Sequence, residues 1–250
     1  MVAGTHRRVL LLLSPLLLLS VACADSAVAP DSGTQSTAPS GAANTGIVVV
    51  DDQIVLNAKL FGGDNDVGVV LAHMRRADQS AWFSFAQLLA DEGYAALTFD
   101  FRGYGASGGS EDLNKLDDDL REAVRYLHED RGKERVFVVG ASMGGTAALV
   151  VAQDGDARGV VAISAPETFE EQDALSAIGR LDAPVLLLVS EDDTAAMLSL
   201  DDLLEAAPGS PESEAYSGNL HGTDLFQPGS PHYEAITERV LRFLDELRGG

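Results

Sequence analysis

Short runs of consecutive apolar residues recur along this chain, and amphipathic segments separate them. The runs are VGVVLAH (67–73), AALTFD (95–100), RVFVVG (135–140), GVVAIS (159–164) and PVLLLVS (184–190). A continuous apolar run of this length is typical of a strand buried on both faces of a parallel sheet. Helices are expected at 79–92, 113–129, 195–207 and 233–247. The alternation predicts an α/β fold with a mostly parallel central sheet and helices on both of its faces.

Two further segments refine this expectation. The segment IVVVDDQIVLNAKLFGG (47–63) reads as two strands around Asp51 and Asp52, which predicts a β-hairpin. The stretch between Ser164 and Leu181 is too short to hold a separate lid domain. We therefore expect a single domain with no large lid.

The first 22 residues have the pattern of a secretory signal peptide. Arg7 and Arg8 precede an apolar run at 9–22, and small residues follow it. The run is too short to cross a hydrocarbon core of about 30 Å as a helix. Residues 1–22 are therefore excluded from the fold as a targeting segment.

Cys23 is the single cysteine of the chain, so an intrachain disulfide and a cysteine-rich metal site are excluded. The sequence LSVAC (19–23) resembles a bacterial lipobox, in which the cysteine is lipidated and becomes the new N-terminus. Lipidation of Cys23 would anchor the protein to a membrane of the bacterial cell envelope without spanning it. The alternative is ordinary cleavage after Ala22 or Ala24, which would give a secreted soluble protein.

Residues 23–46 are rich in Ala, Ser, Thr, Gly and Pro and lack large apolar side chains. Such a segment cannot bury enough surface to offset its ordering entropy, so a flexible tether is expected there. The folded domain is expected over residues 47–250, which is long enough for one sizeable core.

The chain is strongly acidic, with 17 Lys and Arg residues against 39 Asp and Glu residues and a formal net charge of −22. Such a charge repels phosphate backbones and anionic headgroups. Nucleic-acid binding is therefore not expected, and any membrane association would come through the lipid on Cys23. The sequence carries no signal for the oligomeric state.

The strongest chemical motif is GASMG (140–144), a GxSxG pattern centred on Ser142. It follows a predicted strand and precedes a helical run, which is the context of a nucleophile elbow. A sharp turn there would expose the Ser142 hydroxyl at the carboxyl edge of the sheet. The N–H of Met143, at the start of the helix, would then point to where an oxyanion forms.

A serine nucleophile needs a base and an orienting acid, which follow it in the order acid and then histidine in elbow-type sites. Only His221 and His232 follow Ser142. His221 lies in a turn-like loop and is the expected base, whereas His232 reads as a surface residue at a helix start. His128 reads as an exposed histidine near a helix end.

Three carboxylates follow the strand PVLLLVS, namely Glu191, Asp192 and Asp193. A carboxylate on a loop directly after a strand can reach across to a histidine. Composition alone allows any of the three to be the acid, and the other two would then be solvated charges.

Four segments in order resemble the α/β-hydrolase family, within its lidless esterase, dienelactone-hydrolase-like and serine-peptidase-like group. They are LAHM (71–74), FDFRGYGASGGS (99–110), GASMGG (140–145), and the pair SEDD (190–193) with LHGTDLF (220–226). The resemblance covers nearly all of residues 47–250. It is specific for the fold and much less specific for the substrate.

The resemblance assigns Asp193 as the acid, with Asp192 next, and His221 as the base. It also implies that the second oxyanion N–H comes from Arg75 or Met74, where Met74 replaces the family's usual glycine. His73 would be structural, and Asp100 and Arg102 would brace the neighbouring loop.

The activity implied is hydrolysis of a small, ester-like substrate through an acyl-enzyme on Ser142, with no cofactor or metal required. A serine peptidase or an acyltransferase on the same triad is the alternative within this chemistry. A non-catalytic, lipid-anchored binding protein is the alternative from another class, because fold alone does not give function.

Overall fold

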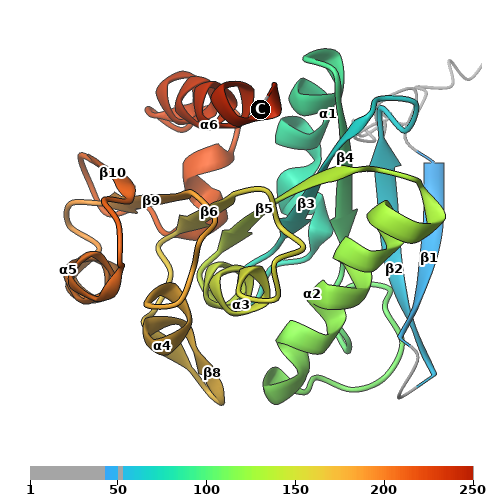
Figure 1. Ribbon diagram of the computed structural model, residues 1–250, viewed down its shortest axis with the longest axis horizontal. Helices are drawn as coiled ribbons and strands as arrows, with labels where there is room; N and C mark the ends of the chain where they lie inside the picture. Colours follow the sequence, from blue (N-terminus) through green and yellow to red (C-terminus); the bar gives the residue numbers. More distant parts are fainter. Residues whose placement is uncertain (1–42, 50–52, 250) are drawn as a thin grey trace, which may run out of the picture. The chain divides into compact units, whose positions relative to one another are not determined.

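The computed structural model describes residues 43–49 and 53–249 (Figure 1). The expected signal peptide, Cys23 and the tether up to residue 42 lie outside the described residues. Among the residues that are described, no helix combines the length and the apolar character needed to cross a membrane.

The centre of the domain is an eight-stranded sheet with the order β1-β2-β4-β3-β5-β6-β9-β10. Its strands are β1 Ala43–Val49, β2 Ile54–Phe61, β3 Val67–Ala72, β4 Tyr94–Phe99, β5 Arg135–Ala141, β6 Val160–Ile163, β9 Val185–Ser190 and β10 Glu212–Tyr216. Strand β2 pairs antiparallel with both of its neighbours, β1 and β4. In the sheet order from β4 to β10, all other neighbouring strands pair in parallel. This arrangement confirms the mostly parallel sheet expected from the apolar runs.

The predicted hairpin is present, but its first strand begins earlier than expected. Strand β1 starts at Ala43, four residues before Ile47, and Ala43 pairs with Leu60 of β2. The small residues of this stretch gave no strand signal in the sequence. An edge strand needs only its backbone N–H and C=O groups to pair, so residues 43–46 belong to the sheet and not to the tether.

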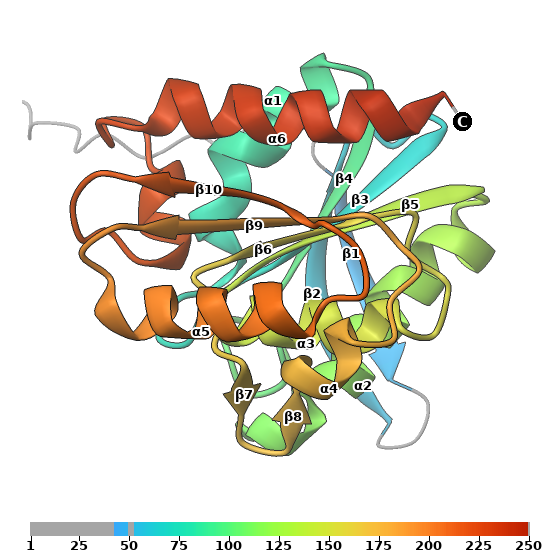
Figure 2. The same ribbon diagram turned by 60° about the vertical axis from the view of Figure 1, so that its left-hand side comes forward.

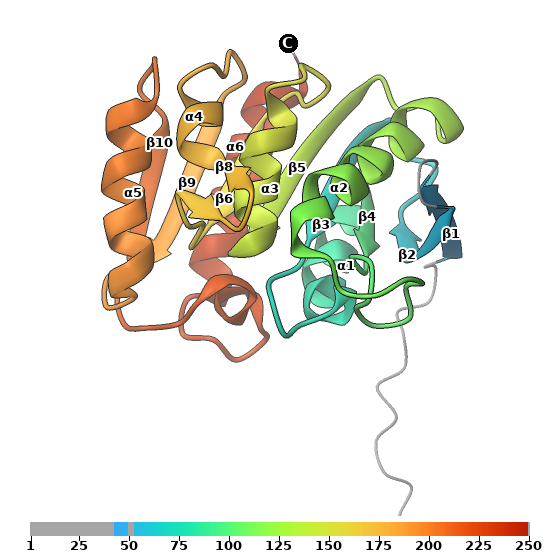
Figure 3. The same ribbon diagram turned by 90° about the horizontal axis from the view of Figure 1, so that it is seen from below.

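Helices cover both faces of the sheet (Figures 1 and 2). One face carries α1 Phe83–Asp91 and α6 Tyr233–Arg248, and the other carries α2 Leu116–Arg125, α3 Met143–Ala152, α4 Ala174–Ile178 and α5 Thr194–Ala206. Figure 3 shows α5, α4, α3 and α2 side by side across that second face. Four of these helices match the segments expected from sequence, and α3 is the helical run expected after Ser142.

The sheet separates two hydrophobic cores, and strand β3 shows how. Val69 and Leu71 belong to the core under α1 and α6, whereas Val70 and Ala72 belong to the core under the other helices. Every residue of β3 is buried. Burial on both faces is the physical reason for the continuous apolar runs.

Between β6 and β9 the described chain forms only a small excursion. It comprises the two-residue strands β7 Thr168–Phe169 and β8 Gln172–Asp173, followed by α4. The hairpin was not expected from sequence. It is far smaller than a domain, so the expectation of no large lid is confirmed for the described residues.

Candidate active site

Strands β5, β6 and β9 are neighbours that run in parallel, so their carboxyl ends meet at one edge of the sheet. Ala141 at the end of β5 pairs with Ile163 at the end of β6, and Ile163 pairs with Leu188 of β9. The residues that follow these strands carry the candidate chemistry. Ligands and substrates of open α/β sheets bind at this type of edge.

Ser142 occupies a strained turn between β5 and α3. Its backbone angles are φ 50° and ψ −119°, which are sparsely populated for a residue with a side chain. The turn is tight because a Cβ at Gly140 would lie 2.1 Å from the carbonyl oxygen of Gly144. A Cβ at Gly144 would lie 2.6 Å from the carbonyl oxygen of Ala72. The structure therefore has the strand, turn and helix that the GxSxG motif predicts.

The structure brings His221 and Asp193 into contact. His221 Nδ1 lies 2.6 Å from Asp193 Oδ2, and the two side chains come from loops after β10 and β9. Asp193 is half-buried, whereas Glu191 and Asp192 are exposed. Of the three carboxylates that composition left open, Asp193 is therefore the one placed to orient the histidine.

The loop that carries His221 lies against the elbow of Ser142. A Cβ at Gly222, the next residue, would lie 3.3 Å from Cβ of Ala141 and 3.0 Å from Sδ of Met74. Gly222 also has a φ of 55°, in the left-handed region that favours glycine. The histidine loop can pack this closely on the nucleophile turn because residue 222 has no side chain.

The other two histidines of interest are engaged elsewhere. His232 Nε2 lies 2.7 Å from the carbonyl oxygen of Ser217, next to the ring of Tyr216. His128 has its two ring nitrogens near the carbonyl oxygens of Lys133 and Asp156. The structure thus places His221, and not His232, beside Asp193.

The first candidate oxyanion donor is the N–H of Met143. Met143 is the first residue of α3, and a first-turn N–H has no acceptor within its own helix. The positive end of the helix dipole adds to the attraction for a developing negative charge. The structure therefore has the helix start at Met143 that an oxyanion donor there requires.

The second candidate donor lies on the loop after β3, at Met74 or Arg75. Met74 contacts Gly222 as described above, and Ala77 N–H donates to the carbonyl oxygen of Met74 at 3.2 Å. The left-handed conformation of this loop falls on Arg76, with φ 63°. Met74 itself has no positive φ, which explains how a methionine is accommodated where the family resemblance implies glycine.

His73 fixes this loop to the loop after β4. Its Nε2 accepts the N–H of Phe101 at 3.1 Å, so its Nδ1 carries the proton that is donated to the carbonyl oxygen of Met74 at 2.8 Å. Burial lowers the pKa of His73, and Asp100 and Asp78 oppose that shift only in part. His73 is therefore a neutral structural residue, as expected.

Arg75 extends from the same loop toward Glu111. Its Nε lies 3.7 Å from Glu111 Oε1, and Tyr104 donates its hydroxyl hydrogen to the same carboxylate at 2.8 Å. Burial and the hydrogen bond to Glu111 raise the pKa of Tyr104 to about 12. The Tyr104 hydroxyl also lies 3.9 Å from Sδ of Met143, which places this polar group beside the nucleophile turn.

Asp100 is a buried hub for the loop that follows β4. Its carboxylate accepts the N–H of Gln79 at 2.8 Å, the Asn57 amide at 2.9 Å and the N–H of Ala106 at 3.0 Å. A Cβ at Gly105 would lie 2.3 Å from Asp100 Oδ2. The bracing role expected for Asp100 is confirmed, but the partners Asn57 and Gln79 could not be named from sequence.

Arg102 braces the same loop through Asp119 of α2. Arg102 Nε and its terminal nitrogen lie 2.9 Å and 2.6 Å from Asp119 Oδ1, and its backbone N–H lies 2.8 Å from Oδ2. Both side chains are buried. Sequence reasoning predicted that Arg102 braces the loop and missed Asp119, which lies in a run of three aspartates that reads as a solvated helix start.

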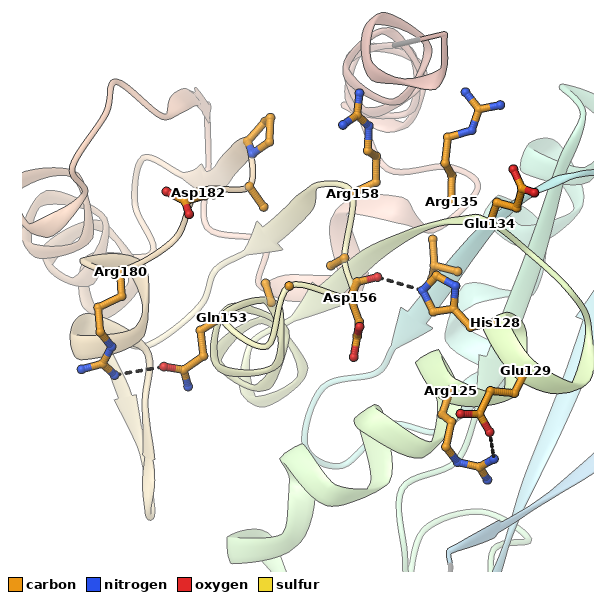
Figure 4. Close-up of a pocket in the computed structure, with 16 residues that line it drawn as sticks. Arg125, His128, Glu129, Glu134, Arg135, Gln153, Asp156, Arg158, Arg180 and Asp182 are labelled. Atoms are coloured by element: carbon orange, nitrogen blue, oxygen red, sulfur yellow. Dashed lines mark hydrogen bonds and ion pairs between the residues drawn. The ribbon is translucent and has the colours of Figure 1, made fainter.

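A cavity of about 530 Å³ lies at the opposite edge of the sheet, near the start of β5 at Arg135 (Figure 4). Its lining is rich in charged side chains, and some of them already have partners. Arg125 donates to Glu129 at 2.9 Å, and Arg180 donates to Gln153 at 3.0 Å. The cavity lining does not include Ser142, Asp193 or His221, which lie at the other edge of the sheet.

Comparisons with known proteins give partial sequence matches to this chain. A family model described as Hydrolase_4, serine aminopeptidase S33, matches residues 64–173. Two curated relatives are both called uncharacterized protein YfhR. The one from Escherichia coli O157:H7 is 29% identical over 109 residues, 42% of this chain and 38% of the relative. The one from Salmonella typhimurium is 30% identical over 89 residues, 34% of this chain and 30% of the relative. The match thus spans less than two fifths of these relatives' length.

Solved structures resemble the whole described domain. The esterase Pf2001 of Pyrococcus furiosus has a TM-score of 0.70 at 20% identity, over 82% of this chain and 92% of the esterase. The dienelactone hydrolase of Anabaena variabilis has a TM-score of 0.68 at 21% identity, over 82% of this chain and 97% of that enzyme. These matches show that the chain has the α/β-hydrolase fold.

Proposed function

We propose that the protein is a serine hydrolase that cleaves a carboxylic ester-like bond through Ser142, His221 and Asp193. The observation that carries the proposal is the 2.6 Å contact between His221 and Asp193, on a loop that packs against the strained turn of Ser142. A serine in this conformation is costly to keep, and such strain concentrates at functional sites. In the proposed enzyme, the strained turn holds the Ser142 hydroxyl at the edge of the sheet.

In the proposed reaction, His221 takes the proton of the Ser142 hydroxyl as the oxygen attacks the substrate carbonyl. Asp193 holds the imidazole through Nδ1 and stabilises its charged form. The N–H of Met143, with that of Arg75 or Met74, binds the oxyanion. His221 then protonates the leaving group, and water, activated by the same histidine, releases the acid and restores Ser142.

The substrate that this site favours is a small ester or an exposed end of a larger molecule. The described chain between β6 and β9 forms only a small hairpin and α4, which leaves no large cover over the edge. The net charge of −22 favours neutral or cationic substrates over anionic ones. A negatively charged ester that is hydrolysed faster than its neutral isostere at low salt would contradict this preference.

A serine peptidase is the second candidate, and one observation favours it. The family model that matches residues 64–173 is described as a serine aminopeptidase. The same triad can attack an amide, because the leaving group is selected by the shape of the pocket and not by the nucleophile. Acyl transfer to an acceptor other than water uses the same acyl-enzyme.

The experiment that tests the function is a steady-state assay of the full-length chain on matched esters, thioesters and amides of one acyl group. We expect the ester to give the highest kcat/KM, and Ser142→Ala and His221→Ala to lower kcat by about 10⁴-fold or more. His232→Ala is the matched histidine control and should retain activity within about two-fold of the wild type. Amide turnover above ester turnover would favour the peptidase, and no turnover would favour a binding protein.

We further propose that the chain is exported and anchored to a membrane of the bacterial cell envelope through lipid on Cys23. The proposal is supported by the LSVAC sequence and by the position of this single cysteine. Radiolabelled palmitate should enter the wild-type chain in a bacterial host and not the Cys23→Ser variant. Equal labelling of both chains, or labelling of neither, would contradict lipidation and favour a secreted soluble protein.

A further inference from the structure

The end of β6 touches both the proposed nucleophile and the loop of the proposed base. The carbonyl oxygen of Ile163 accepts the backbone N–H of Ser142 at 2.8 Å. The next residue, Ser164, accepts the backbone N–H of Gly222 on its hydroxyl oxygen at 3.1 Å. Two consecutive residues therefore hold the backbones on which the serine and the histidine of the triad depend.

Ser164 holds an unusual conformation in order to make this contact. Its φ is 49°, in the left-handed region that a serine rarely adopts, and it directly follows the last residue of β6. Its own N–H donates to the carbonyl oxygen of Leu188 at 2.8 Å, and its side chain is buried. Neighbouring strands thus fix the backbone of Ser164, and a strained residue fixed by its surroundings is typical of a functional position.

A second buried serine holds the other side of the histidine. Ser190, at the end of β9, donates its hydroxyl hydrogen to the carbonyl oxygen of Leu220 at 2.6 Å. Its backbone carbonyl accepts the N–H of Asp193 at 3.1 Å. Ser190 is fully buried. His221 therefore lies between two residues, Leu220 and Gly222, that are each bonded to a buried serine hydroxyl.

We propose that Ser164 is a positioning residue that sets the place of His221 relative to Ser142 by holding Gly222, with Ser190 holding Leu220. The inference rests on the proposed function. Proton transfer from the Ser142 hydroxyl needs the imidazole at hydrogen-bond distance, and an error of about 1 Å can lower the rate by about 10²-fold. Without the Ser164 hydroxyl, the buried N–H of Gly222 loses its acceptor, and the loop shifts to find another.

The test compares Ser164→Gly with the wild type in the full-length chain. Glycine removes the hydroxyl and also relieves the left-handed strain, which offsets part of the cost of the lost hydrogen bond, so the variant should still fold. We expect kcat on the best ester to fall by about 10-fold to 100-fold, with KM within about two-fold, because the Ser164 side chain is buried and its hydroxyl accepts the N–H of Gly222. Ser164→Ala is the second variant, which lacks the hydroxyl but keeps the strain, and it should show the same loss of kcat.

Thr237→Val is the matched control for the loss of a buried hydroxyl. Thr237 is buried in α6, and its hydroxyl donates to the carbonyl oxygens of Tyr233 and Glu234 in the same helix. The control should retain the wild-type kcat within about two-fold. Equal loss of kcat in Thr237→Val and Ser164→Gly would mean that the effect is general destabilisation, which would overturn the inference.

Amide hydrogen exchange gives a readout that does not depend on turnover. In Ser164→Gly, the amide of Gly222 should exchange at least about 10-fold faster, whereas the amide of Ser142, bonded to Ile163, should keep its rate. Unchanged exchange at Gly222 together with unchanged kcat would overturn the role of Ser164 and leave the proposed hydrolase intact. A wild-type chain with no turnover on any substrate would overturn the proposed function, and with it the positioning role.

Discussion

Asp193 Oδ2 lies 2.6 Å from Nδ1 of His221, and this contact joins the loop after β9 to the loop after β10. The carboxylate is mostly buried while the imidazole keeps 41% of its side chain exposed. The other ring nitrogen of His221 is therefore the one left to serve the chemistry at the edge of the sheet. Of the three consecutive carboxylates, Asp193 is the one that the structure places against the imidazole.

We expect Asp193→Asn to lower kcat by about 10³-fold to 10⁴-fold, because the amide no longer favours the productive tautomer or the charged imidazole. Asp192→Asn is the matched control, since its side chain is exposed and its backbone N–H donates to the carbonyl oxygen of Gly218. Steady-state ester hydrolysis measures both variants. An Asp192→Asn variant as impaired as Asp193→Asn would contradict the assignment.

Because the backbone of Ser142 is strained, we expect a substitution that relieves the strain to raise stability while it removes activity. Its φ of 50° and ψ of −119° cost about 1–3 kcal/mol for a residue with a side chain. Ser142→Gly should therefore raise the free energy of unfolding by about 1 kcal/mol, or Tm by about 2–4 °C, while abolishing turnover. Thermal unfolding followed by circular dichroism measures the change.

Ser142→Ala is the control for that prediction, because alanine removes the hydroxyl but keeps the strained backbone. It should lose turnover as fully as Ser142→Gly without a comparable gain in Tm. A glycine variant that melts below the alanine variant would show that the backbone of Ser142 stores no strain.

Because His73 is buried, we expect the free energy of unfolding to fall on acidification. Burial lowers its pKa in the folded state, so the folded chain binds fewer protons than the unfolded chain as the pH falls below about 6.5. The stability due to neutral His73 is present above that pH and is lost below it, by up to about 1.4 kcal/mol per pH unit. Urea unfolding at pH 5.5 and 7.5 measures the difference.

His73→Asn should flatten this pH dependence even if the variant is less stable overall. Asparagine can still donate to the carbonyl oxygen of Met74, but it does not titrate in this range. If the variant and the wild type lose equal stability between pH 7.5 and 5.5, another group is responsible.

A single substitution in the buried pair of Arg102 and Asp119 should strongly lower the free energy of unfolding. Arg102→Met leaves a carboxylate with no exposed surface and no counter-charge from that side chain, which should cost about 3–5 kcal/mol of unfolding free energy. Adding Asp119→Asn should recover part of the loss, because the charge is removed. Chemical denaturation of the two variants tests the coupling.

Lys115 and Asp118 provide the exposed comparison for that pair. Their ion pair is 2.9 Å long, but both side chains are substantially exposed. Lys115→Met should therefore cost at most about 1 kcal/mol. Similar losses for the buried and the exposed pair would contradict the role of burial.

The sheet was predictable because its signal is local. Strands such as β3 and β5 are buried on both faces, so each run of apolar residues marks a strand without reference to the rest of the chain. The elbow was predictable for the same reason, since Gly140, Ser142 and Gly144 lie in one short motif. The order of acid and histidine after the nucleophile then left few candidates.

The contacts that hold the site were not predictable, because they join distant parts of the chain. Ser164 and Ser190 read as the polar ends of two strands, and nothing local shows that their hydroxyls bond to the loop of His221. The only signal in the sequence for these contacts was that a small polar residue stands at the end of each of two buried, adjacent strands. The start of strand β1 was placed too late because its first residues carry no large apolar side chain and pair with a later part of the chain, β2.

We infer that His221 and Asp193 activate Ser142 as a nucleophile. The most direct measurement is reaction of the full-length chain with a fluorophosphonate, followed by mass spectrometry to locate the adduct. Such a probe reacts with a serine whose base and oxyanion donors are assembled. We expect one adduct per chain, on Ser142, absent from Ser142→Ala and His221→Ala and present in His232→Ala. A folded wild-type chain that forms no adduct, or that carries it on another serine, would rule out Ser142 as the nucleophile.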